Sequence, residues 1–100
     1  MISVKVTYTV KDHFVDQNIK NIHEFLKDFG SMDNDNFKYS IHVLEDRKTF
    51  MHLSQYNNQV VQQELLNVSS FLSFQKQRDE NLESEPAVEL LNLIGASKGL

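Results

Sequence analysis

A β-hairpin is encoded in the stretch Phe37-Lys-Tyr-Ser-Ile-His-Val-Leu-Glu-Asp-Arg-Lys-Thr-Phe-Met-His-Leu-Ser-Gln-Tyr56. Each half alternates between apolar and polar residues, which is the period-two pattern of a half-buried strand. The pair Asp46-Arg47 lies between the halves and can form a tight turn. With this turn, Ile41 is predicted to pair with His52, and the pairing assigns every side chain of the hairpin to one face.

The two predicted faces of the hairpin differ in character. One face is mainly apolar and aromatic and consists of Phe37, Tyr39, Ile41, Val43, Phe50, His52, Ser54 and Tyr56. The other face consists of Lys38, Ser40, His42, Leu44, Thr49, Met51, Leu53 and Gln55. Because apolar side chains are driven out of water, we expect the first face to pack against helices.

The N-terminal segment predicts a strand followed by a helix. Residues 2–10 alternate strictly, with β-branched residues on one face. Asp12 is a good N-cap, because its side-chain oxygen can accept from the free amides of a first helical turn. Apolar residues then recur at helical spacing as far as Phe29, and Gly30 stands where a helix end favours left-handed backbone.

The C-terminal half predicts a second helix and a last strand. Asn57-Asn58 can cap the helix, a break is expected around Ser69-Ser70, and further helical turns extend to Arg78. A charged loop follows, and residues 87–94 have the composition of a strand. The resulting order is strand, helix, strand, strand, helix, strand. This order predicts a single α+β domain over residues 1–100 with the ferredoxin-like βαββαβ arrangement, a four-stranded antiparallel sheet with two helices on one face.

Composition narrows the classes of function. The chain has 100 residues, a formal net charge of −4 and no cysteine. The lack of cysteine excludes disulfides, thiolate metal sites and cysteine nucleophiles. No apolar run approaches the length of about 18 residues that a membrane helix needs, and no basic segment precedes an apolar one at the N-terminus. We therefore expect a cytoplasmic protein without membrane contact.

The second sheet face has no helix to cover it in this arrangement. Its predicted members include Leu44, Met51 and Leu53, which are unfavourable in water. An exposed apolar sheet usually marks an interface, and two copies packed sheet to sheet would cover it. We expect a homodimer through this face, in the form of a dimeric α+β barrel.

Two segments resemble a known superfamily. Thr49-Phe-Met-His-Leu-Ser-Gln-Tyr followed by Asn-Asn, and then Leu65-Leu-Asn-Val-Ser-Ser-Phe-Leu-Ser-Phe-Gln75, are similar to the antibiotic biosynthesis monooxygenase-like superfamily of dimeric α+β barrels. The resemblance implies a pocket between helices and sheet in each subunit. Some relatives oxidise phenols with molecular oxygen and no prosthetic group, others degrade heme, and others isomerise small sugars. The heme-degrading branch uses an Asn, Trp and His set, and this chain lacks Trp.

Polar side chains on the helix-facing sheet surface are the candidates for chemistry. We expect His52 and Tyr39 to be catalytic, because an imidazole with a pKa near 6.5 can exchange a proton at neutral pH and a phenol can hold a substrate oxygen. Substrate-binding candidates are Tyr8, Ser54, Tyr56, His23 and Arg78. The structural alternative is a buried histidine that is hydrogen-bonded to a tyrosine without any reaction.

A metal site and a cofactor are not expected. The register places His42 on the face opposite His52, and His13 and His23 are separated by about 15 Å of helical rise. Such distances do not allow one ion to be chelated. Glycine is too sparse for a phosphate-binding loop.

Three functions therefore compete. The first is a cofactor-independent monooxygenase, or a small-molecule isomerase, acting on a small aromatic or carbonyl compound. The second is a non-catalytic ligand-binding or oligomerisation module on the same fold. The third is an RNA-binding ferredoxin-like domain, which the missing glycines of the third strand and the net negative charge oppose.

Overall fold

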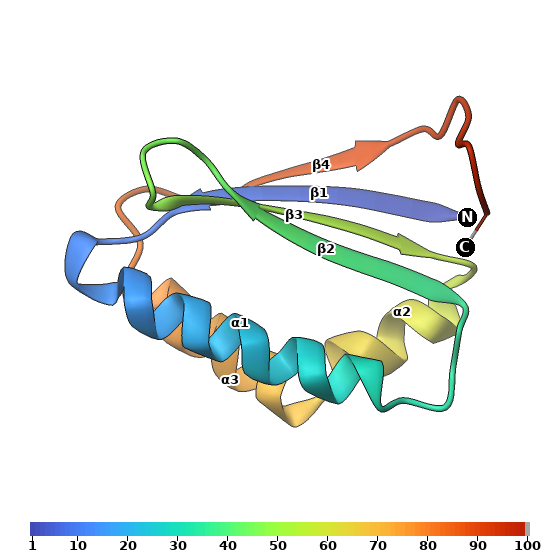
Figure 1. Ribbon diagram of the computed structural model, residues 1–100, viewed down its shortest axis with the longest axis horizontal. Helices are drawn as coiled ribbons and strands as arrows, with labels where there is room; N and C mark the ends of the chain where they lie inside the picture. Colours follow the sequence, from blue (N-terminus) through green and yellow to red (C-terminus); the bar gives the residue numbers. More distant parts are fainter. Residues whose placement is uncertain (100) are drawn as a thin grey trace.

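The computed structural model describes residues 1–99 and has a layer of helices on one face of a four-stranded antiparallel sheet (Figure 1). The elements are β1 (Ile2–Thr9), the 3-10 turn η1 (Asp12–Phe14), α1 (Val15–Gly30), β2 (Phe37–Val43), β3 (Thr49–Tyr56), α2 (Gln59–Leu66), α3 (Ser69–Asp79) and β4 (Ala87–Leu91). The strands lie in the order β2-β3-β1-β4. The predicted ferredoxin-like α+β fold is confirmed.

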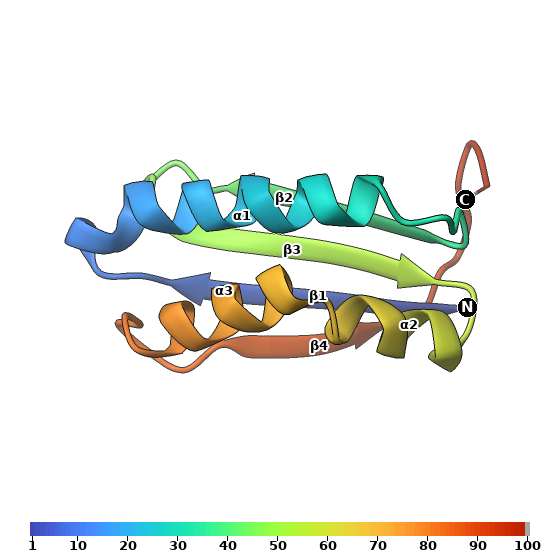
Figure 2. The ribbon, with the colours of Figure 1, turned by 90° about the horizontal axis from the view of Figure 1, so that it is seen from below.

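The helices form two rows on the same side of the sheet. Figure 2 shows α1 running along β2 and β3, and α2 and α3 following one another along β1 and β4. The second helix predicted from the sequence is divided at Val68, whose backbone is extended with φ −66° and ψ 129°. The predicted cap of α2 is confirmed, because the Asn58 side chain accepts a hydrogen bond from the Val61 amide at 3.0 Å.

The β2–β3 hairpin has the predicted register. Ile41 pairs with His52, and the Leu44 amide donates to the Thr49 carbonyl at 2.8 Å. In the turn, Asp46 Oδ1 accepts from the amide of Thr49 at 2.8 Å. The Arg47 amide donates to the Leu44 carbonyl at 2.9 Å, and Arg47 has φ 65°, the left-handed conformation often found after such a turn in a hairpin loop.

Three local predictions at the ends of elements are wrong. Asp12 does not cap a helix; a 3-10 turn begins there, and its carboxylate accepts from Lys48 Nζ at 3.1 Å. Gly30 is the last residue of α1 and no glycine among residues 1–99 has a positive φ. The last strand ends at Leu91, whereas residues 87–94 were predicted. Leu91 pairs with Ser3, and β1 begins at Ile2, so β1 offers almost no further partners.

Aromatic rings fill the space between the helices and the sheet. Phe25 of α1 is fully buried, with ring centroids 4.8 Å from Phe74 and 5.1 Å from Phe71 of α3. It also lies 5.7 Å from Tyr39 and 6.2 Å from His52. Phe25 therefore joins α1, α3 and the sheet at one point. Among residues 1–99, no helix has the length and apolar character needed to cross a membrane.

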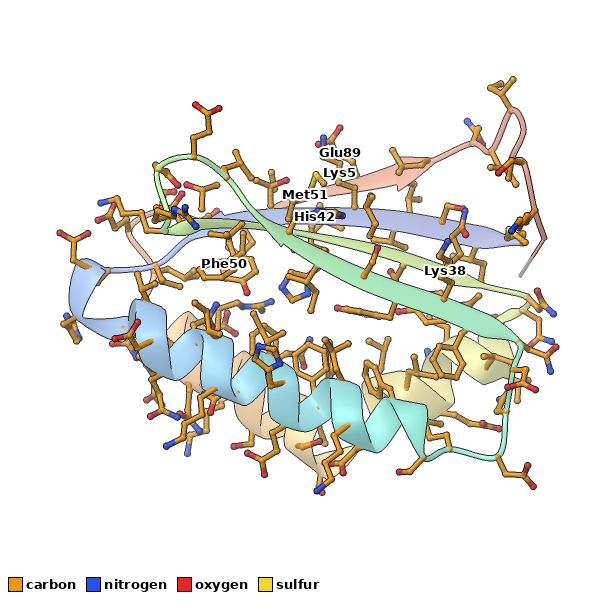
Figure 3. The ribbon with its side chains drawn as sticks, viewed as in Figure 1. Lys5, Lys38, His42, Phe50, Met51 and Glu89 are labelled. Carbon is orange, nitrogen blue, oxygen red and sulfur yellow. The ribbon has the colours of Figure 1, made fainter. Side chains whose placement is uncertain are left out.

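The uncovered face of the sheet has charged as well as apolar side chains. Figure 3 shows Lys5, Met51 and Glu89 projecting away from the helices, whereas Phe50 points toward them. Lys5 Nζ and a Glu89 oxygen are 3.9 Å apart across β1 and β4. Leu44 directly follows β2, its amide still donates to the Thr49 carbonyl, and its side chain is 43% exposed.

Candidate functional site

His52 lies at the centre of the helix-facing sheet surface. It occupies the middle of β3, opposite Val6 of β1 and Ile41 of β2, and is 2% exposed. Both ring nitrogens have hydrogen-bond partners: Nε2 lies 2.8 Å from the Tyr8 hydroxyl, and Nδ1 lies 2.8 Å from the Tyr39 hydroxyl. The imidazole therefore connects strands β1 and β2 through two phenols.

The connection continues into α1. Asn18 is fully buried, and its Nδ2 donates to the Tyr8 hydroxyl at 3.0 Å. Its Oδ1 has no hydrogen-bond partner within residues 1–99, although it is buried. Asn18, Tyr8, His52 and Tyr39 thus form one continuous hydrogen-bonded chain from the helix to the sheet, which we call the Asn–Tyr–His–Tyr chain.

Burial keeps the imidazole of this chain neutral. Loss of solvation, with a smaller contribution from the positive charge of Arg78, lowers the pKa of His52 to about 3. Burial likewise raises the pKa of Tyr8 and Tyr39 well above the ordinary value of a phenol. The chain is uncharged at neutral pH, so His52 does not titrate there as the sequence-based assignment assumed. A neutral imidazole has one N–H and one lone pair, so one tyrosine must donate to it and the other must accept from it.

One end of the chain reaches a cavity. A cavity of about 180 Å³ opens between β1, the β2–β3 hairpin, α2 and α3, and its polar lining consists of Tyr39, Ser54, Tyr56, Gln62, Gln75 and Arg78. The structure thus brings four of the predicted site residues together around one space. Tyr8 and His52 do not line the cavity; they are connected to it through the hydrogen bond between His52 and Tyr39. The apolar part of the lining consists of Val4, Val6, Leu66 and Phe71, so the cavity offers a small ligand both apolar contacts and hydrogen-bonding groups.

Arg78 supplies a cation to this cavity. Its guanidinium lies 5.4 Å from the ring centroids of both Tyr8 and Phe74, and only 12% of its side chain is exposed. Nη2 lies 2.9 Å and Nε lies 3.0 Å from one Asp79 oxygen. Because Asp79 is itself more than half exposed, solvent screens this pair and leaves much of the positive charge acting on the cavity.

His23 does not belong to this cavity, contrary to the sequence-based expectation of a residue at its mouth. It is exposed on α1 and lines a separate groove of about 230 Å³ between α1 and β2, together with His42 and Phe50. Among residues 1–99, no three metal-ligating side chains converge on one point.

Sequence reasoning missed three polar residues, Asn18, Gln62 and Gln75. A signal existed for Asn18, because it follows Phe14 by four positions and precedes Phe25 by seven, which is the spacing of one helix face. Gln62 and Gln75 have no comparable signal. Their place at the cavity depends on how α2 and α3 turn relative to β1.

Several solved structures share the fold of this chain. An antibiotic biosynthesis monooxygenase matches with a TM-score of 0.81 and 11% sequence identity, covering 95% of this chain and 100% of its own. A protein of Mycobacterium tuberculosis matches with a TM-score of 0.80 and 13% identity, covering 97% and 98%. The chain has the monooxygenase-like fold. A protein of Pseudomonas aeruginosa also matches, with a TM-score of 0.76, 14% identity and 94% coverage of both chains.

The resemblance drawn from the hairpin and the segment that follows it is therefore confirmed at the level of the fold. No protein-family model matches the sequence, and no curated protein is significantly similar to it. At sequence identities of 11–14%, structural similarity does not assign roles to individual residues, so function must be argued from the site itself.

The neutral state of His52 predicts how stability depends on pH. In the unfolded chain the imidazole has its ordinary pKa of 6.5, whereas in the folded chain the pKa is about 3. Between these values the unfolded state binds a proton that the folded state does not, so this contribution is complete above pH 6.5 and is lost as pH falls. We expect a slope of up to about 1.4 kcal/mol per pH unit in that window.

Urea unfolding at several pH values between neutral and about pH 4 measures this slope. The variant His13→Ala is the control, because His13 is an exposed histidine in the η1 turn and its loss leaves the buried imidazole in place. A stability that is flat through this window would show that His52 is accessible to protons in the folded state.

Proposed function

We propose that this chain is a cofactor-independent monooxygenase-like enzyme that binds a small aromatic or carbonyl compound in the helix–sheet cavity and oxidises it with molecular oxygen. The observation that carries the proposal is the Asn–Tyr–His–Tyr chain, which ends at Tyr39 in the wall of a cavity that also contains Arg78. A structural neighbour described as an antibiotic biosynthesis monooxygenase supports the same class of reaction.

Tyr39, Arg78 and His52 would each have a separate role in the reaction. For a phenol, the balanced reaction is phenol plus O₂ giving a quinone plus water, so one oxygen atom enters the ring and the other leaves as water. Tyr39 would hold the substrate oxygen by a hydrogen bond, and the positive charge of Arg78 would favour electron density on that oxygen. His52 would act as a positioning residue that orients the Tyr39 hydroxyl, since it does not line the cavity.

The test is oxygen consumption and ligand binding with a panel of phenols, hydroxyquinones and small carbonyl compounds. Tyr39→Phe keeps the ring and removes the hydroxyl, and we expect at least a tenfold loss of kcat/KM for any compound that is oxidised. His13→Ala serves as the control outside the cavity and outside the sheet. Ligand binding without oxygen consumption would contradict the proposed enzyme and favour a non-catalytic ligand-binding module.

We also propose that two copies associate through the uncovered sheet face. Met51 and Leu53 are half-buried on that face in the single chain, and a second sheet would remove them from water. The complementary charges of Lys5 and Glu89 would be repeated across a two-fold axis.

Light scattering of the purified protein tests the dimer. We expect the mass of two chains, and we expect Leu53→Arg to shift the protein to a single chain because it places a charge inside the sheet-to-sheet contact. Leu72→Arg is the control, since Leu72 is 47% exposed on α3, away from the sheet. A single-chain mass for the unmodified protein at high concentration would contradict the proposal.

A further inference from the structure

His42 belongs to the uncovered face of the sheet. Its strand partner is Met51, and directly paired residues of antiparallel strands share a face. Figure 3 shows Met51 projecting away from the helices, so His42 lies on the face through which we propose that two copies associate. In the single chain His42 is exposed. A second copy on this face would therefore change the surroundings of an ionisable side chain.

The closest neighbours of His42 on this face are uncharged. Met51 lies directly opposite, and Leu53 is a diagonal neighbour on β3. Ser40 lies two positions earlier in β2 and shares the same face. Because β2 is the edge strand, His42 also borders the groove between α1 and β2, where His23 is the other titratable residue of the lining. A second sheet would thus enclose the imidazole mainly with apolar side chains.

The charged groups of this face lie farther from His42. Lys38 is four positions away in the same strand, which is about 13 Å at the ordinary rise of a strand. Lys5 and Glu89 lie two and three strands away, or about 10 and 14 Å at ordinary strand spacing, and they pair with each other at 3.9 Å. Exposed charges in the turn after β2 are screened by water; they belong to Glu45, Asp46 and Arg47. Among the described strand residues, no carboxylate of the same copy is therefore close enough to pair with a protonated His42.

Protonation of His42 would oppose the contact between two copies for two reasons. A charged imidazole loses more solvation than a neutral one when apolar groups cover it. In addition, the described strands give this face two lysines, Lys5 and Lys38, and one carboxylate, Glu89. A two-fold axis brings two such faces together, so each added proton increases the repulsion between like charges.

We propose that His42 makes the association of two copies sensitive to acid, because the neutral imidazole fits between the two sheets and a protonated one drives them apart. This inference rests on the proposed association through the uncovered face and adds its regulation. A separated copy can bind a proton that the dimer excludes, so the dimer is strongest above the pH range in which histidine ordinarily titrates and weakens as pH falls through it. With two such protons per dimer, the dissociation constant can rise by up to about a hundredfold per pH unit.

Sedimentation velocity of a dilution series at about pH 7.5 and about pH 5.5, at one ionic strength, measures this effect. We expect the dissociation constant to be at least about tenfold higher at the lower pH. His42→Gln keeps a polar side chain but cannot bind a proton in this range, so the difference should fall below about threefold. His23→Gln is the matched control, because His23 is an exposed histidine on α1, and it should retain the full difference.

The possible results separate this inference from the proposed association. Equal dissociation constants at the two pH values would overturn the inference, and so would the full difference in His42→Gln. A tighter dimer at the lower pH would also overturn it, since a carboxylate such as Glu89 of the second copy would then pair with the protonated imidazole. Single chains at every concentration and neutral pH would remove the proposed association itself.

Two further measurements keep the test independent of folding. Far-UV circular dichroism at both pH values checks that the copies stay folded, which we expect because the pKa of the buried His52 is about 3. If His42→Gln does not associate at neutral pH, His42→Met replaces it, since methionine matches the neighbouring Met51 and has no charge. The full pH difference in His42→Met would overturn the inference.

Discussion

Replacement of Phe25 by alanine lowers the free energy of unfolding by about 3–5 kcal/mol. The ring is fully buried where α1 meets α3 and the sheet, and it packs against Phe71, Phe74 and Tyr39. Its loss removes apolar burial and leaves a void that these rings cannot close without turning away from their present partners. A change of this size is a large fraction of the stability of a domain of this length.

Urea unfolding followed by circular dichroism measures the change. Leu72→Ala is the matched control, because Leu72 is an apolar residue of α3 that is 47% exposed, and we expect a loss below about 1 kcal/mol. A cost for Phe25→Ala no larger than that of the control would mean that the aromatic core packs differently from the structure described above.

Replacement of His52 by alanine also lowers the free energy of unfolding by about 3–5 kcal/mol, for a different reason. The hydroxyls of Tyr8 and Tyr39 each lose a partner at 2.8 Å; Tyr8 keeps the bond from Asn18, and a buried polar group without a partner costs about 1–3 kcal/mol. The remainder comes from the space left by the imidazole, whose ring stacks on Phe74 with centroids 5.4 Å apart.

Urea unfolding at neutral pH measures this loss, with His13→Ala as the control outside the sheet. We expect the control to change stability by less than about 0.5 kcal/mol, since His13 is exposed in the η1 turn. A lower turnover of His52→Ala could therefore come from lost catalysis or from lost stability. Tyr39→Phe is the better test of catalysis, because it removes only one hydroxyl. Equal stability of the two histidine variants would show that the buried hydrogen bonds of His52 contribute nothing.

The hairpin illustrates how much of the fold could be predicted. Alternation of side chains and the Asp46-Arg47 turn were sufficient to predict that Ile41 pairs with His52, and that register brings Tyr39, Ser54 and His52 to the helix-facing side. These are local properties, because strand periodicity and turn geometry depend on residues close together in the chain. The predicted helix ends were less accurate. Asp12 was expected to cap the first helix, but its carboxylate accepts a hydrogen bond from Lys48, which lies in a distant loop.

The site was predicted only in part, for reasons that concern burial and packing. Tyr39, Ser54 and Tyr56 lie on the predicted sheet face and line one cavity with Arg78, whereas their roles stay predictions; the neutral state of His52 was not foreseen. A pKa depends on the solvent that a group loses and on the charges around it, and neither is visible in a strand pattern. Whether His23 or Gln75 reaches the cavity depends on the rotation of a whole helix.

By itself, the amino-acid sequence determined the order of the strands and helices, the register of the hairpin and the set of polar residues on the covered face. These follow from periodicity and from turn chemistry, which act over a few residues. Only the tertiary structure decided that Asn18 donates to Tyr8, that His52 is buried and neutral, and that Tyr39 lies in the wall of a cavity. The reason is physical: hydrogen-bond direction, desolvation and empty volume arise where distant segments pack together.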